Sequence, residues 1–106
     1  MRKMGGELGI ALKAGALLKK IREHVQKGTY IVSAHAFQRQ NERLIDLKHV
    51  LYVLKNGARE EKKDLFDVKT QMWKYAICGK TIDGISLRVI VAFEDEMIII
   101  TVIRVK

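Results

Sequence analysis

The sequence predicts an α+β protein, with N-terminal helices packed on one face of a mainly antiparallel sheet of three to four strands. Apolar residues recur at helical spacing in the first half of the 106 residues, and runs rich in β-branched side chains fill the second half. The dipeptide Asp83-Gly84, which is typical of a tight hairpin, separates two of those runs. Hydrophobic residues make up 48% of the chain, enough for a core without a disulfide or a structural metal.

The first element is expected after a short leader. Residues 1–14 contain several glycines and basic side chains, and we interpret them as a flexible leader before a single domain over residues 15–106. An apolar stripe predicts a helix over residues 15–27, which Gly28 should end. A brief extended segment follows at Tyr30-Ile31-Val32.

Ser33 is a predicted N-cap for a second, basic helix. His35, Arg39 and Arg43 would then follow one another on a single helix face. Neighbouring like charges at this spacing repel one another, and a phosphate-bearing ligand would relieve that repulsion. The alternative is a solvated basic face with a histidine that only caps or packs.

A third helix is predicted over residues 47–56, with Asp46 as its N-cap and Gly57 at its end. Residues 58–67 are heavily charged and alternate poorly, which suits either a protected edge strand or an exposed loop. Three strong strand candidates complete the chain, at residues 72–80, 85–93 and 97–105.

A two-residue turn at Asp83-Gly84 would set Ile82 opposite Ile85 and fix the hairpin register. Gly79 would then face Arg88, and Trp73 and Tyr75 would share one side of the sheet with that arginine. Cys78 would lie on the other, apolar side, where a thiol stays protonated. In the last strand either Thr101 or Arg104 would join Arg88, depending on whether the loop before it has two or three residues.

The composition indicates a polyanionic partner. The formal net charge is +8 and the pI is about 9.8, which favours nucleic acid over an anionic membrane or an acidic protein. No segment is long and apolar enough to cross a bilayer, and no secretory signal is evident. A single cysteine suits a reducing cytoplasm. Paired metal-ligand spacings and a glycine-rich phosphate loop are absent, so no cofactor is expected.

The candidate site residues divide by their chemistry. His35 is the best candidate for proton transfer, because imidazole changes charge near neutral pH, and Tyr75 is the second candidate. Arg39, Arg88 and, less strongly, Arg43 can give bidentate hydrogen bonds to a phosphate. The remaining candidates would track or stack on RNA, although each could equally be a solvated or core residue: Lys62, Lys63, Lys69, Trp73, Lys74 and Arg104.

These motifs together resemble a family of small bacterial proteins known only as a domain of unknown function. The resemblance covers residues 15–106 and includes Ser-Ala-His-Ala-x-x-Arg-x-x-x-Arg from Ser33, Trp-Lys-Tyr-x-Ile-x-Gly-x-Thr-x-Asp-Gly-x-x-Leu-Arg from Trp73, and Ile-Ile-Ile-Thr-Val-Ile near the end. Family members often have a glycine after the second arginine, where this chain has Leu44-Ile45.

The resemblance implies a RelE-like fold and a distant relationship to the RelE, BrnT and MqsR toxins of toxin–antitoxin modules. It also implies metal-independent RNA cleavage, with ribosome-presented mRNA as one substrate, and a partner antitoxin of the zinc-finger, helix-turn-helix kind. The resulting hypothesis is an endoribonuclease that acts through the ribose 2′-hydroxyl. Two alternatives are a non-catalytic RNA-binding module and a structural adaptor that binds an acidic protein.

Overall fold

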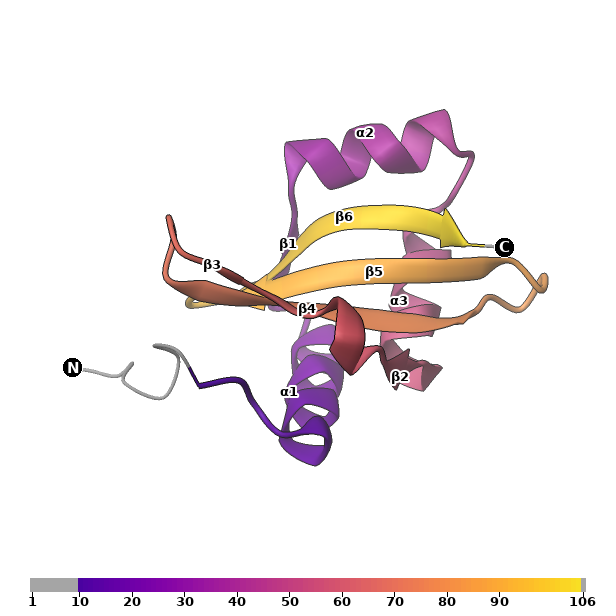
Figure 1. Cartoon of the computed structure of the whole chain (residues 1–106). Helices are drawn as coiled ribbons and strands as arrows, with labels where there is room; N and C mark the ends of the chain where they lie inside the picture. The colour runs from indigo at the N-terminus through magenta and orange to yellow at the C-terminus, as the bar shows by residue number, and fades with distance from the viewer. Residues whose placement is uncertain (1–9, 106) are drawn as a thin grey trace.

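The computed structural model describes residues 10–105, and the first nine residues of the predicted leader lie outside the described part. The described chain contains three α-helices and six strands, and the α-helices all precede the last five strands (Figure 1). They are α1 (Ala14–Lys27), β1 (Tyr30–Val32), α2 (Ala34–Glu42), α3 (Leu47–Asn56), β2 (Ala58–Arg59), the 3-10 turn η2 (Glu61–Lys63), β3 (Leu65–Asp67), β4 (Met72–Lys80), β5 (Ser86–Phe93) and β6 (Met97–Val105). No helix among residues 10–105 is long and apolar enough to cross a membrane.

The helices begin and end where their capping residues predict. Gly28 adopts φ +73° after α1, a left-handed conformation that glycine reaches without strain. Ser33 Oγ accepts a hydrogen bond of 3.0 Å from the backbone N–H of Ala36 and so caps α2. At the start of α3 the backbone N–H of Asp46 donates to His49 Nδ1 over 3.2 Å.

The sheet is larger than predicted. Its main path runs β1-β6-β5-β4-β2, and β3 pairs separately with β4. The strands β4, β5 and β6 form the expected antiparallel meander, but β1 pairs with β6 in parallel. The α+β class is therefore confirmed and the count of three to four strands is wrong. Three short segments account for the difference, because two or three residues each are too few to give a recognisable alternation.

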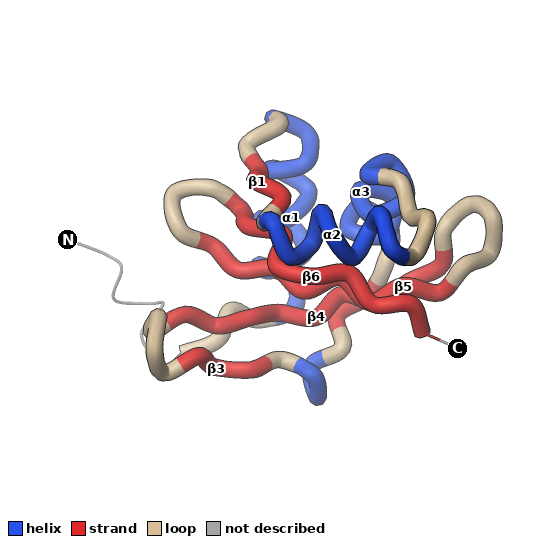
Figure 2. Tube along the Cα trace, turned by 90° about the horizontal axis from the view of Figure 1, so that it is seen from above, coloured by secondary structure: helices blue, strands red, loops and turns tan. Residues whose placement is uncertain are grey.

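The helices occupy two places around the sheet (Figures 1 and 2). α1 and α3 lie on one face, whereas α2 runs alongside β6. β1 is only three residues long, so beyond Val32 the chain continues beside β6 as α2. Ser33 Oγ, at the start of this helix, donates to the carbonyl of Ile100 in β6 over 2.9 Å. The prediction that all the helices share one face is therefore wrong for α2.

The core lies between the sheet and the helices α1 and α3. Leu17 and Ile21 of α1 and Val50 of α3 are fully buried there. From the sheet, the buried members of the same cluster are Tyr75, Ile77, Leu87, Val89, Val91, Phe93, Met97, Ile99 and Val102. Because successive side chains of a strand alternate, the residues between these point to the opposite side, called the outer face below.

The β4–β5 hairpin has a three-residue loop, not the predicted two-residue turn. Thr81 N donates to Ile85 O over 2.8 Å, and Gly84, at φ +83°, donates to Thr81 O over 2.9 Å. This arrangement moves every pairing by one residue, so that Arg88 pairs with Cys78 and Val91 pairs with Tyr75. A one-residue shift exchanges the two faces of a strand. The predicted row of Trp73, Tyr75 and Arg88 on one face is therefore wrong.

The last strand contains a second irregularity. The β5–β6 loop has three residues, since Phe93 pairs with Met97. A loop of this length alone would place Arg104 on the face of Arg88. However, the register shifts beside Ile90, so that Ile90 pairs with Thr101 and Leu87 pairs with Arg104. Thr101 therefore shares the outer face with Arg88, and Arg104 lies on the other face.

Candidate functional site

His35 and Arg39 form an exposed pair on α2. Arg39 Nε lies 3.5 Å from His35 Nε2 in a long, weak hydrogen bond. The same guanidinium donates from Nη1 to Glu42 Oε1 over 3.1 Å, with side chains that are 39% and 47% exposed. An exposed ion pair of this kind contributes about 1 kcal/mol at most, so it leaves Arg39 available to a stronger anion.

Arg43 does not continue the helix. α2 ends at Glu42, and Arg43 is the C-cap with φ −104°. Its Nη1 atom is buried and has no hydrogen-bond partner among the residues that the structure describes. The predicted face of His35, Arg39 and Arg43 is therefore only partly present, because the third side chain projects from non-helical backbone.

Arg88 lies on the outer face and is held by Glu60. Its Nε donates to Glu60 Oε1 over 2.6 Å and its Nη2 donates to Oε2 over 3.2 Å, a bidentate pair. These hydrogen bonds lower the pKa of Glu60 and raise that of Arg88. The side chains are 18% exposed for Arg88 and 31% exposed for Glu60. The pair is therefore ionised at neutral pH and remains within reach of solvent.

Cys78 sits beside this pair instead of on the apolar side, where the predicted register had placed it. Burial, followed by the charge of Glu60, raises the pKa of its thiol. The thiol is therefore protonated at neutral pH, as predicted. Burial is the larger cause, and the Glu60 carboxylate on the outer face adds to it.

A hollow of about 540 Å³ lies beside η2. Glu60, Glu61, Lys62 and Lys63 line it, so that one member of the bidentate pair and two exposed lysines border one space. Two of the predicted RNA-binding lysines thus share a hollow with Glu60, the partner of Arg88. Nothing in the sequence marks Glu60 itself, since it is one acid in a mixed run of charges.

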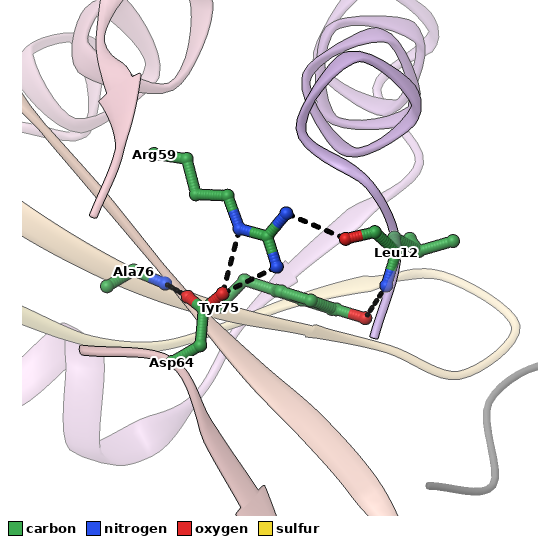
Figure 3. Close-up of polar contacts among 5 residues, drawn as sticks. All are labelled: Leu12, Arg59, Asp64, Tyr75 and Ala76. Atoms are coloured by element: carbon green, nitrogen blue, oxygen red, sulfur yellow. Dashed lines mark hydrogen bonds and ion pairs between the residues drawn. The ribbon is translucent and has the colours of Figure 1, made fainter. Parts of the chain in front are cut away.

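Tyr75 and Trp73 face the core. Tyr75 is 1% exposed, and its hydroxyl accepts a hydrogen bond of 3.0 Å from the backbone N–H of Leu12 (Figure 3). Trp73 stacks on Tyr75 at 6.4 Å between ring centres and packs edge-on against Phe66 at 5.5 Å. The two rings are therefore engaged in packing, and the predicted shared site with Arg88 does not form.

The other predicted RNA-binding residues are scattered. Lys74 Nζ pairs with Asp67 Oδ2 at 3.1 Å, and Lys69 is exposed in the β3–β4 turn, where its backbone N–H donates to Asp67. Arg104 is exposed on the face opposite Arg88. The structure thus brings His35 and Arg39 together on α2, and it places Lys62 and Lys63 around one hollow with Glu60, the partner of Arg88.

The comparisons with known proteins identify the family. The model of the family described as "Domain of unknown function (DUF4258)" matches residues 32–104. The match begins at the end of β1 and includes α2, α3 and the sheet, so the chain belongs to this family. Comparison with curated proteins and with solved structures gave no match.

Proposed function

We propose that the protein is a metal-independent endoribonuclease of the toxin type, with a RelE-like fold and a cytoplasmic site of action. The observation that carries the proposal is the contact between His35 and Arg39 on α2. Arg39 Nε lies 3.5 Å from His35 Nε2, and a neutral imidazole has one ring nitrogen that can accept a proton. A proton acceptor and a phosphate-binding cation thus stand side by side on an exposed helix.

The reaction that fits these groups is transfer of a phosphate within RNA. The ribose 2′-oxygen forms a bond to phosphorus while the bond from phosphorus to the 5′-oxygen breaks. His35 takes the 2′ proton, the leaving 5′-oxygen takes a proton from water, and the products carry a 2′,3′-cyclic phosphate and a 5′-hydroxyl. Arg39 stabilises the extra negative charge of the pentavalent intermediate. Arg88 is paired with Glu60 in a separate group and has no assigned part in this step.

The net charge of +8 supports the same substrate, because it attracts a polyanion and makes binding sensitive to salt. Tyr75 does not fit the role of proton acceptor, because its side chain is buried and its hydroxyl accepts a hydrogen bond from the backbone of Leu12. An antitoxin of the zinc-finger, helix-turn-helix kind is the protein partner that the toxin proposal implies.

The first test is cleavage of RNA in the presence of a chelator, with and without ribosomes. Wild-type protein should release fragments, and His35→Ala should lower the rate by about 10²-fold to 10⁴-fold, the usual contribution of a general base. Lys48→Ala, which removes a charge from α3, is the matched control and should cleave like the wild type.

A second candidate function is binding of RNA without cleavage. The pairing of Arg39 with Glu42 and of Arg88 with Glu60 favours it, because structural arginines are held in this way. Binding alone cannot separate the two functions. If the wild-type protein never cleaves and His35→Ala binds RNA as tightly as the wild type, the binding module is the correct function.

A further inference from the structure

We propose that Glu60 occupies the phosphate site of Arg88 in the free protein, and that RNA binds there by displacing it. The inference rests on the proposed RNA-binding function and adds its phosphate subsite: Arg88 on the outer face, next to the hollow that Glu60, Lys62 and Lys63 help to line. The ligand is a backbone phosphate of single-stranded RNA.

The geometry of the Arg88 guanidinium carries the first step. A planar guanidinium that donates from Nε and Nη2 to the two oxygens of one group has the orientation that also binds two phosphate oxygens. In the free protein, the Glu60 carboxylate therefore accepts the two hydrogen bonds that Arg88 could give to a phosphate.

The position of Glu60 carries the second step. Its backbone N–H donates to Ala76 O over 2.8 Å, which anchors the residue to β4, but its side chain reaches Arg88 from the border of an open hollow. Because the Glu60 side chain is 31% exposed, its carboxylate can turn into water and be solvated there. Arg88 would then need a new anion, since it is only 18% exposed.

The lysines of η2 carry the third step. Lys62, Lys63 and Glu61 line the same hollow as Glu60, so the departure of the Glu60 carboxylate leaves two lysines and one acid around the space. Lys63 also helps to keep the carboxylate ionised, because its charge contributes to the lowered pKa of Glu60. A phosphate bound to Arg88 in place of that carboxylate would lie next to the hollow that the two lysines border.

The test measures binding of a single-stranded oligonucleotide with 2′-O-methyl riboses, which cannot react through a 2′-hydroxyl. Glu60→Gln and Glu60→Ala should bind about threefold to tenfold more tightly than the wild type, because one competing carboxylate is gone. The slope of log affinity against log salt should stay close to that of the wild type, because RNA contacts the same phosphates in both proteins. Arg88→Ala should flatten the slope by about 0.7, the value for one phosphate contact on a single strand.

The controls separate this site from general charge effects. Glu94→Gln removes the same charge at the far end of β5 and should change the affinity by less than about twofold, with an unchanged salt slope. Arg88→Ala should weaken binding and should abolish the effect of Glu60→Gln in the double variant. Thermal melts of each variant establish that it is folded.

Two results would overturn the inference. In the first, Glu60→Gln binds no more tightly than Glu94→Gln, so Glu60 does not compete for the site. In the second, Glu60→Gln retains its full effect in the Arg88→Ala background, so the site is not Arg88. The assay measures binding and does not depend on cleavage. A protein that never cleaves RNA would therefore contradict the ribonuclease proposal without changing the binding results expected for the Glu60 variants.

Discussion

Leu44 has an unusual backbone conformation for a branched apolar residue. It adopts φ +55° directly after the Arg43 cap, and its side chain is 88% exposed. This is the position at which the family resemblance predicts a glycine. A left-handed conformation costs a non-glycine residue about 1 to 2 kcal/mol, and no burial of Leu44 offsets that cost.

We therefore expect Leu44→Gly to raise the free energy of unfolding. The relief of strain exceeds the entropy cost of a glycine in the unfolded chain, so the net gain should be about 0.5 to 1 kcal/mol. Urea denaturation measures it, and Leu44→Ala, which keeps a Cβ, should show no such gain. A loss of stability in the glycine variant would contradict this prediction, because it would mean that the Leu44 side chain contributes more to stability than its backbone strain costs.

The Glu60–Arg88 pair predicts a pH dependence of stability. The pKa of Glu60 is lowered in the folded state by its hydrogen bonds with Arg88, so folding favours the ionised form. This stabilisation is complete above the unfolded pKa of about 4.3 and is lost as the pH falls through the lowered pKa.

Consequently, Glu60→Gln should reduce the unfolding free energy near pH 7 by about 1 kcal/mol, as expected for a partly exposed pair. The difference between the wild type and the variant should shrink as the pH falls below about 4.3. Denaturation curves at several pH values measure this difference. A gap that stays constant down to acidic pH would exclude ionisation of Glu60 as its cause.

At the scale of elements, α3 and β4 meet through two glycines. A Cβ on Gly57 would lie 2.6 Å from the carbonyl oxygens of Cys78 and Val53, and a Cβ on Gly79 would lie 3.0 Å from Gly57 Cα. Neither glycine has positive φ, so close approach of backbone to backbone is what excludes a side chain here.

Gly57→Ala should therefore destabilise the protein by about 2 to 3 kcal/mol through overpacking against rigid backbone. Gly15→Ala is the matched control, because its Cβ would lie in open space within α1, and it should stabilise the protein by about 0.5 to 1 kcal/mol. Thermal or urea denaturation tests both. Equal effects at the two positions would contradict the close packing of α3 on β4.

The helices could be predicted from sequence because their signals are local. Gly28, Ser33 and Asp46 each stand next to an amphipathic stripe, so caps and periodicity agree. The hairpin register could not be predicted, since Asp83-Gly84 suits both a two-residue turn and a three-residue loop with glycine at its left-handed position. The irregularity beside Ile90 depends on how two strands pair, which neither strand encodes alone.

At the scale of the whole molecule, a buried polar cluster ties distant segments together (Figure 3). Arg59 donates to Asp64 Oδ2 over 2.8 Å and to the carbonyl of Leu12 over 2.7 Å. Asp64 Oδ1 accepts from the backbone N–H of Ala76, and Tyr75 OH accepts from that of Leu12. These contacts join the segment before α1 to β2, β3 and β4, so at least Leu12 of the predicted leader is fixed to the sheet.

Loss of one partner in this cluster should be costly. The side chains of Arg59 and Asp64 are only 6% and 3% exposed, and Asp64→Ala would leave a buried guanidinium without its counter-ion. We expect a loss of about 3 to 5 kcal/mol in unfolding free energy. The double variant with Arg59→Leu should lose less than the sum of the two single variants, and strict additivity would contradict the pairing.

The candidate site could be predicted only in part. His35 and Arg39 are four residues apart on one helix, so sequence spacing brings them together. Glu60 and Arg88 are 28 residues apart and meet only because the β4–β5 register turns Arg88 to the outer face. A two-residue turn would place Trp73 and Tyr75 on the face of Arg88. The observed register turns both rings toward the core, on the opposite face.

The central claim is that RNA is cut through its own 2′-hydroxyl, and one measurement tests it most directly. An RNA that the protein cleaves at a mapped position is remade with a single 2′-deoxy nucleotide there and incubated with the protein in chelator. We predict that cleavage at that position disappears while the unmodified RNA gives a 2′,3′-cyclic phosphate end. Equal cleavage of both RNAs, or the absence of cleavage in every RNA tried, would contradict this claim.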